Sequence, residues 1–311
     1  MATPLKIILI LLVAAFQGLV AAPALAWDAI PQQVAPGVYV FVGDTGPRSV
    51  ANEGMNATTG FIVTTAGVVV VDSGSSHQVA TKIEAAIRRV TPQPIKFVIN
   101  TGGQDHRWLG NGYFADQGIP ILASGKTAAD IADRGGMWAA GMEKLLGAAF
   151  AGTRLQPPTR TFKERETLTL GGETIELIFT GGGHTPGDIL VWLPDRRIVF
   201  SGDLVFVDRL LGVLPVSNVK AWLASFDALA ALDPQWIIPG HGAPATLAKA
   251  RKETRDYLAL LHAHMKKAFD AGDDIQSAIK SLDDAAFADL PTYHELRGQN
   301  ANRVYLEVEA E

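Results

Sequence analysis

The sequence predicts an α/β protein built as a four-layer αβ/βα sandwich, in which two mixed sheets are flanked by helices. Three observations lead to this prediction. Short β-branched runs alternate with helical segments in the first half of the chain, further short strands follow one another in the second half, and each half has its own helices. Since the apolar face of a sheet must be buried, two such halves are expected to pack sheet against sheet, with helices outside.

The chain begins with a segment that is typical of a secretory signal peptide. Lys6 precedes an apolar stretch at 7–20, and Ala24-Leu25-Ala26 follows as a small-residue cleavage motif. The stretch is too short and too interrupted for a membrane span, which needs about 20 mostly apolar residues. We therefore predict a signal peptide at 1–26, one domain at 27–311, a periplasmic or secreted location and no stable membrane association after cleavage. An uncleaved anchor is the alternative.

The composition limits the chemistry. The sequence has no cysteine, so no disulfide can form and any metal must be held by nitrogen and oxygen ligands. The formal net charge is −5 at pH 7, and no basic stripe is present. We therefore do not expect nucleic acid as a partner. We expect a small-molecule substrate.

The first half of the chain predicts a buried sheet with a helix across it. Its strands are short β-branched or aromatic runs separated by Gly, Pro and Asn. A helix at 76–90 is expected because Val79, Ile83 and Ile87 recur at helical spacing before Pro92. The predicted elements around it are strands at 38–42, 59–64, 67–72, 95–99 and 120–123, and a helical stretch at 128–149.

The second half predicts a second, mostly antiparallel sheet. Its strands recur at roughly ten-residue intervals with Gly-Gly or Pro-Asp between them, which is typical of hairpins. Helical segments return towards the end of the chain. The predicted elements are strands at 167–170, 173–179, 189–193, 197–200 and 235–239, and helices at 220–232 and 244–271.

The polar residues that could carry chemistry lie in turns directly after these strands. They are Asp72, the loop 100–107, His184, Asp203 and His241. A fold that repeats strand, glycine and polar residue brings distant segments together at one edge of its sheets. We therefore predict a single site.

Three motifs near these residues carry a family resemblance: Gly181-Gly-Gly-His184-Thr-Pro-Gly-Asp188, Phe200-Ser-Gly-Asp203 and Ile238-Pro-Gly-His241. With them the chain resembles the metallo-β-lactamase superfamily over nearly all of its length after the signal segment. Within it, the chain looks most like the exported quinoprotein relay system zinc metallohydrolases, which implies a role in a quinoprotein dehydrogenase pathway. The segments that carry this closer likeness are 33–41, 88–91, Tyr293-His294 and Asn300-Ala301.

The superfamily resemblance implies a hydrolase with two metal ions. In its pattern, Asp72 ends a supporting strand, and a loop of the form Asn-Thr-His-x-His-x-Asp-His supplies four groups. His184 completes the first metal position, Asp203 bridges the two, and His241 completes the second. We expect Asp72 to hold the 100–107 loop in place.

The loop departs from this pattern. Aligned without a gap, it has Gly102 and Gln104 in place of the first two histidines, His106 in place of the aspartate and Arg107 in place of the last histidine. A gapped alignment instead keeps Asp105-His106 as the Asp-His pair. We favour the ungapped alignment because both flanks of the loop fit it.

The altered loop predicts one metal ion rather than two. The first position keeps only His184 and Asp203, which are too few ligands for zinc. The second position keeps His241, Asp203 and His106, with Asp105 or Gln104 nearby. These nitrogen and oxygen ligands suit zinc, and iron and manganese are the alternatives. Arg107 argues against a metal ion at this position, because its guanidinium would repel the cation or take the place of its charge.

Two functions follow. The first is a metal-dependent hydrolase of an ester, thioester, lactone or similar acyl bond, in which Asp105 is the nearest carboxylate able to accept a proton from metal-bound water. The second is a catalytically inactive periplasmic binding or accessory protein, in which Gly, Gln and Arg of the loop hold an anionic ligand.

Overall fold

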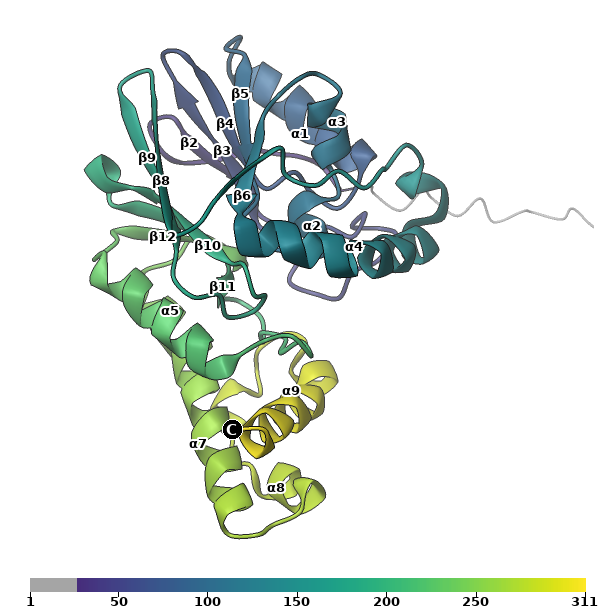
Figure 1. The fold of residues 1–311 in the computed structure, drawn as a ribbon, viewed down its shortest axis with the longest axis vertical. Helices are drawn as coiled ribbons and strands as arrows, with labels where there is room; N and C mark the ends of the chain where they lie inside the picture. Colours follow the sequence, from purple (N-terminus) through teal and green to yellow (C-terminus); the bar gives the residue numbers. More distant parts are fainter. Residues whose placement is uncertain (1–26) are drawn as a thin grey trace, which may run out of the picture.

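The computed structural model describes residues 27–311, so the predicted signal peptide at 1–26 lies outside the described residues. Two sheets pack face to face and carry helices on their outer faces (Figure 1). The predicted four-layer α/β architecture is confirmed. No helix among residues 27–311 is long and apolar enough to cross a membrane.

The first sheet contains seven strands in sequence order. Pairing is antiparallel from the first strand to the fourth and parallel from the fourth to the seventh. The last strand was not predicted, because three residues, two of them exposed, show no pattern. The strands are β1 (Gln32–Ala35), β2 (Val38–Phe41), β3 (Thr59–Thr64), β4 (Gly67–Val71), β5 (Ile95–Ile99), β6 (Ile121–Ser124) and β7 (Arg160–Phe162).

The second sheet has five strands in the order β12-β11-β10-β9-β8. Every pair is antiparallel except β11 with β12, which confirms the prediction of a mostly antiparallel sheet. The strands are β8 (Arg165–Leu170), β9 (Glu173–Phe179), β10 (Ile189–Leu193), β11 (Ile198–Phe206) and β12 (Trp236–His241).

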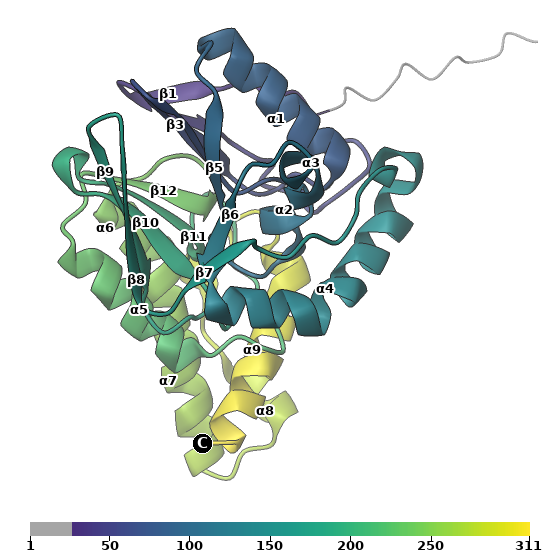
Figure 2. The ribbon, with the colours of Figure 1, turned by 45° about the horizontal axis from the view of Figure 1, so that its top comes forward.

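An apolar core lies between the sheets, where Val71 and Ile99 of the first belong to one cluster with Val191, Phe200 and Ile238 of the second. Separate clusters bury the outer faces under the helices. Figure 2 shows the helices of the first half over the first sheet and those of the second half over the other. The helices on the first half are α1 (His77–Val90), α2 (Asp105–Trp108), α3 (Asn111–Ala115) and α4 (Gly125–Leu146), and α5 (Val219–Ala231) covers the second sheet.

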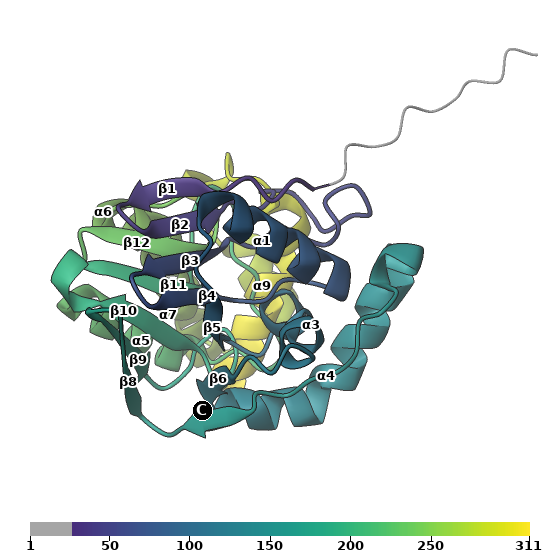
Figure 3. The ribbon, with the colours of Figure 1, turned by 90° about the horizontal axis from the view of Figure 1, so that it is seen from above.

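Helix α1 agrees closely with the prediction for 76–90. The Ser76 hydroxyl caps its first turn by accepting from the backbone NH of Val79, and Val79 and Ile83 are fully buried against the sheet. Helix α4 begins a few residues earlier than predicted and lies against β6 and β7 at the end of the first sheet (Figure 3).

The long helix predicted at 244–271 is interrupted. It consists of α6 (Leu247–Ala250), a π turn η3 (Arg251–Arg255) and α7 (Asp256–Asp270). The hydroxyl of Thr254 accepts from the backbone NH of Phe206 at 3.0 Å and donates to its carbonyl at 2.6 Å. The π turn therefore ties the helix to the end of β11, close to Asp203.

The C-terminal helices were not predicted. They are α8 (Ile275–Ser281) and α9 (Tyr293–Glu309), which pack with α7 beyond the two sheets (Figure 1). Their residues join the apolar cluster under the second sheet. Short 3₁₀ turns complete the described chain: η1 (Gly147–Phe150), η2 (Pro194–Arg196) and η4 (Ala285–Phe287).

Candidate metal centre

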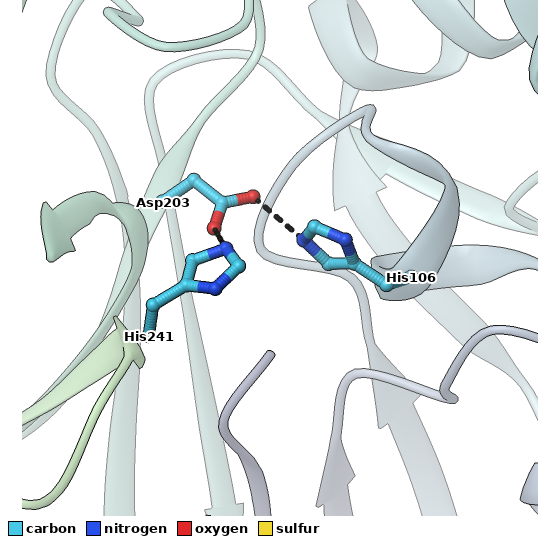
Figure 4. A group of neighbouring side chains, drawn as sticks. All are labelled: His106, Asp203 and His241. Atoms are coloured by element: carbon cyan, nitrogen blue, oxygen red, sulfur yellow. Dashed lines mark hydrogen bonds and ion pairs between the residues drawn. The ribbon is translucent and has the colours of Figure 1, made fainter. Parts of the chain in front are cut away.

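Three side chains from different elements converge at one edge of the sheets. Asp203 lies in β11, His241 ends the neighbouring parallel strand β12, and His106 lies in α2 after β5. All three are buried, and their ligand atoms lie within 4.8 Å of one another. The two imidazoles point at the carboxylate from two sides (Figure 4), with His106 Nε2 3.2 Å from Oδ2 and His241 Nε2 3.1 Å from Oδ1.

The hydrogen bonding of His241 leaves its Nε2 free to bind a cation. Its Nδ1 lies 2.6 Å from the carbonyl oxygen of Asn56, which can only accept, so Nδ1 carries a proton. Burial lowers the pKa of His241 to about 3, and the ring is therefore neutral at pH 7. Its Nε2 lone pair consequently faces the Asp203 carboxylate, and a cation between them would relieve the repulsion.

Arg107 lies behind the carboxylate with every N–H satisfied. Its Nε and Nη2 donate to Asp203 at 3.0 and 2.6 Å, and its Nη1 donates to Asp72 at 2.9 Å. The other two N–H groups donate to the carbonyls of Thr58 and Gly240. Although burial opposes the charge, Asp203 and Asp72 raise the pKa of Arg107 above its usual value. The guanidinium is thus a permanent, fully buried cation.

Arg107 does not use up the ligand capacity of Asp203. A carboxylate has about four lone-pair directions, and Arg107 takes one on each oxygen. The remaining direction on each oxygen faces His106 or His241. Burial alone would raise the pKa of Asp203, but Arg107 holds it well below its usual value, so Asp203 stays ionised. These residues fit one metal ion.

The first metal position of the family pattern is not built. The Nε2 of His184 lies 2.6 Å from Oε1 of Gln104, and His184 is not part of the group of ligand atoms. A Cβ atom at Gly102 would lie 2.5 Å from Oδ1 of the buried Asp188, so no histidine fits there without a rearrangement. In the ungapped alignment Gln104 replaces a histidine of the first metal position and His106 replaces the aspartate of the second. The contacts of Gln104 with His184 and of His106 with Asp203 agree with that alignment.

The charges around the centre also match one divalent ion better than two. The carboxylates of Asp72, Asp105 and Asp203 are paired with the guanidinium groups of Arg48 and Arg107, and the histidines are neutral. With Arg209, whose buried guanidinium lines the adjacent cavity, the charges of these groups sum to zero. One divalent cation then leaves two excess positive charges in this region, and a second ion would double that excess, which burial strongly disfavours.

Asp105 lies beside the centre rather than in it. Its carboxylate is paired with Arg48, and its Oδ1 lies 3.4 Å from Nδ1 of His106. Nη2 of Arg48 donates to that Nδ1 at 3.1 Å, so Nδ1 accepts and the proton of the neutral ring lies on Nε2, facing Asp203. Asp105 thus lies behind the imidazole of His106 and orients it through Arg48, and a metal ion at Nε2 would displace that proton. The role of Asp105 as proton acceptor or metal ligand stays a prediction.

Asp72 supports the loop, as expected. It follows β4 in the left-handed region, with φ of 67°, and its carboxylate accepts from the backbone NH and the hydroxyl of Thr101. Burial raises the pKa of Asp72 to about 6, partly offset by Arg107. Asp72 thus connects the start of the 100–107 loop to Arg107 at its end.

A cavity of about 250 Å³ opens next to the centre. It is lined by Gln104, His184 and His241 of the site and by Glu295 and Leu296 of α9. The other lining residues come from the segment around 47–56, from the end of β11 and the chain that follows it, and from α9 and its N-cap. They are Pro47, Arg48, Asn56, Phe206, Arg209, Gly212, Leu214, Thr292 and Gln299.

Sequence reasoning missed Asn56, Arg48 and Arg209. Asn56 acts through its backbone carbonyl, and a backbone contact cannot be recognised from the type of side chain. Arg48 lies in a Gly-Pro-Arg turn far from any recognised motif, and only the fold brings it to His106. Arg209 had a weak signal, because it follows Asp203 by six residues, shortly after the end of the same strand.

Asp188 allows a pH-dependent prediction. Its Oδ2 accepts from the backbone NH of Thr185 at 2.7 Å, and burial raises the pKa of Asp188 from 3.8 to about 8. The protonated form therefore stabilises the fold, fully below about pH 4, and this contribution is lost as the pH rises through about 8. We expect Asp188→Asn, which cannot ionise, to gain about 1 kcal/mol or more relative to the wild type between pH 5 and 8.

Urea unfolding of both proteins at the two pH values measures this difference. A stability difference between Asp188→Asn and the wild type that does not change with pH would show that Asp188 is ionised throughout.

Comparison with known proteins agrees with the fold and identifies the family. The family model of the metallo-beta-lactamase superfamily matches residues 53–241. The chain belongs to this superfamily, whose fold is that of metal-binding hydrolases and whose members generally bind zinc. The matched range includes Asp72, the 100–107 loop, His184, Asp203 and His241.

Individual relatives are distant. A metallo-beta-lactamase type 2 of Bacteroides fragilis is 32% identical over 92 residues, which is 28% of this chain and 37% of the relative. A linear primary-alkylsulfatase of Pseudomonas sp. (strain ATCC 19151) is 22% identical over 233 residues, 63% of this chain and 44% of the relative. The chain thus spans less than half the length of each of these two relatives.

Solved structures show the same fold. A metallo-beta-lactamase from Pontibacter korlensis superimposes with a TM-score of 0.61 at 22% identity, covering 74% of this chain and 98% of that one. A sec-alkylsulfatase from Pseudomonas sp. gives a TM-score of 0.68 at 18% identity, covering 89% of this chain and 50% of that one.

Proposed function

We propose that this protein is a hydrolase that uses one divalent metal ion, zinc in the first instance, held by His106, Asp203 and His241. Its substrate is a small molecule with an ester, thioester, lactone or similar acyl bond. The observation that carries the proposal is the neutral His241, whose Nε2 lone pair is directed at an ionised, buried carboxylate 3.1 Å away.

The chain's own residues prepare this centre. A bound metal ion would supply a Lewis acid and a water of lowered pKa. Arg107 keeps Asp203 ionised and fixes the plane of its carboxylate through two hydrogen bonds. Asn56 holds the proton of His241 on Nδ1, and the ring of Phe206 stacks on this imidazole with centroids 4.3 Å apart. Both contacts keep Nε2 in one orientation.

The class of reaction is supported by the fold and by the relatives. The two distant relatives described above are named a lactamase and an alkylsulfatase, so hydrolysis of more than one bond type occurs on related chains. We choose acyl bonds because a partly apolar cavity beside a metal-bound water suits attack on a carbonyl carbon. The particular bond stays open within that class.

An activity screen tests this proposal. The purified protein is assayed on p-nitrophenyl esters, a thioester and a lactone as isolated, after chelation and after zinc is added back. We expect hydrolysis that chelation abolishes and zinc restores, that His241→Ala lacks and that His262→Ala keeps, since His262 lies on α7 far from the centre. Hydrolysis that survives in both chelated protein and His241→Ala would contradict the metal mechanism.

Export and pathway also belong to the proposal. The pattern of residues 1–26 supports a periplasmic or secreted protein, and the likeness to the quinoprotein relay group supports a role near a quinoprotein dehydrogenase. Mass spectrometry of the protein from its native host tests the first point, with a mature chain beginning at Trp27 as the expected result.

One alternative function has a specific observation in its favour. Arg107 already neutralises Asp203, and Gln104 already bonds to Nε2 of His184, so these hydrogen bonds need no metal. A catalytically inactive binding or accessory protein would be built in this way. Such a protein would be isolated free of metal and would be inactive in the screen with or without zinc.

A further inference from the structure

Arg209 places a positive charge at the cavity that no carboxylate neutralises within the described part of the chain. The side chain is only 6% exposed, and its Nη1 donates to the carbonyl of Gly46 at 3.0 Å. Its Nε is buried without a hydrogen-bond partner among residues 27–311. Burial lowers the pKa of Arg209 to about 10, so the group is still a cation at neutral pH.

Such a charge is unusual in a folded protein. A buried ion is strongly disfavoured unless it is paired or hydrogen-bonded, because it loses its hydration. The other deeply buried arginine of this site, Arg107, donates to five acceptors, three of which are oxygens of two carboxylates. Arg209 meets one backbone carbonyl. The difference indicates that the counter-ion of Arg209 comes from outside the chain.

The neighbours of Arg209 do not supply this counter-ion. Arg48, which lines the same cavity, is already paired with Asp105. Asp203, Asp44 and Glu295 act on Arg209 only over a longer distance, since among residues 27–311 none of them forms an ion pair with it within 4.0 Å. Two cationic groups and one carboxylate, Glu295, therefore face the cavity, and only Arg209 is both buried and unpaired.

Part of the cavity wall is apolar. Phe206, Leu214 and Leu296 line it together with Arg209 and the imidazoles of His184 and His241. An arginine Nε and the adjacent Nη2 form one edge of the guanidinium, which matches the two oxygens of a carboxylate. The cavity thus combines a carboxylate receptor with an apolar wall beside the metal centre.

We propose that this cavity binds a small organic carboxylate with an apolar body, and that Arg209 pairs with its carboxylate group. This ligand class deepens the function proposed above, because the claim that the bound carboxylate is the substrate rests on that function. The binding itself does not depend on a metal ion, since Arg209 supplies the charge.

Binding of hexanoate and of hexanol, which has the same chain without the charge, tests the proposal. Both probes are titrated by calorimetry and by NMR into the protein as isolated and after chelation. We expect hexanoate to bind in both forms and hexanol to bind at least about tenfold more weakly, because hydrogen bonds to charged groups contribute a factor of about ten or more.

Two variants identify the receptor. Arg209→Met keeps the apolar length of the side chain, and we expect it to weaken hexanoate binding at least about tenfold while leaving hexanol binding unchanged. Glu295→Gln is the matched control on α9, and we expect it to bind hexanoate as well as or better than the wild type. Thermal unfolding shows that both variants are folded; removal of an unpaired buried charge should leave Arg209→Met at least as stable as the wild type.

The outcomes separate this proposal from the metal-dependent function. Hexanoate binding that Arg209→Met retains, equal binding of hexanol, or no binding at all would overturn the carboxylate receptor. Hexanoate binding that only chelation removes would assign the carboxylate to the metal ion and would also overturn it. Binding that depends on Arg209 in a protein that holds no metal would leave the receptor in place and refute the hydrolase.

Discussion

Replacing Arg107 by methionine is expected to destabilise the protein by about 3–5 kcal/mol, the cost of breaking a buried ion pair from one side. The substitution leaves the carboxylates of Asp72 and Asp203 buried beside each other without their shared cation. It also removes the donor to the carbonyl of Thr58 and one of the two donors to the carbonyl of Gly240. Urea unfolding of Arg107→Met and the wild type at pH 7 measures the difference.

A surface arginine provides the matched control for this prediction. Arg154 pairs with Asp116, and both side chains are largely exposed. Arg154→Met should therefore change stability by less than about 1 kcal/mol. A loss in Arg107→Met that is no larger than in Arg154→Met would show that Arg107 does not hold the centre together. Added zinc should partly restore the stability of Arg107→Met, because a divalent cation can replace the lost charge.

Removing either imidazole of the proposed ligand set is expected to abolish metal binding. In His106→Ala and His241→Ala, only two of three protein ligands remain, so we expect zinc affinity to fall by roughly a hundredfold or more. His184→Ala is the matched control, because His184 is equally buried but bonds to Gln104 instead of joining the ligand group. It should keep its zinc affinity within about tenfold, since it removes no ligand.

Competition with a chromogenic chelator measures these affinities. A large loss of zinc affinity in His184→Ala, with little change in His106→Ala, would show that the metal binds at the first position of the family pattern and would contradict a centre at His106, Asp203 and His241.

Much of the fold could be predicted because the local signals are strong. The β-branched runs of β3, β4 and β5 alternate with the amphipathic α1, and the Ser76 cap marks where that helix begins. The hairpins of the second sheet carry turn residues at regular intervals. Helix α9 could not be predicted in the same way, because its buried residues form only a weak helical stripe, and its packing depends on α7, which is distant in sequence.

Only those residues of the candidate site that belong to a recognisable sequence motif could be predicted. Asp203 and His241 each follow a β-branched run and a glycine in the sequence. The structure brings them together because β11 and β12 are parallel neighbours. The sequence could not show whether Arg107 blocks a metal ion or supports it, because this depends on which side of Asp203 the guanidinium lies. It also could not place Arg209, whose missing partner becomes visible only when the surrounding side chains are in place.

X-ray diffraction from crystals of the protein, purified without added metal and measured on both sides of the zinc, iron and manganese absorption edges, tests the central claim most directly. We predict one anomalous peak, bounded by Nε2 of His106, Nε2 of His241 and the carboxylate of Asp203. No peak at this position, or a peak beside His184, would contradict the single-metal centre and leave the binding-protein function in its place.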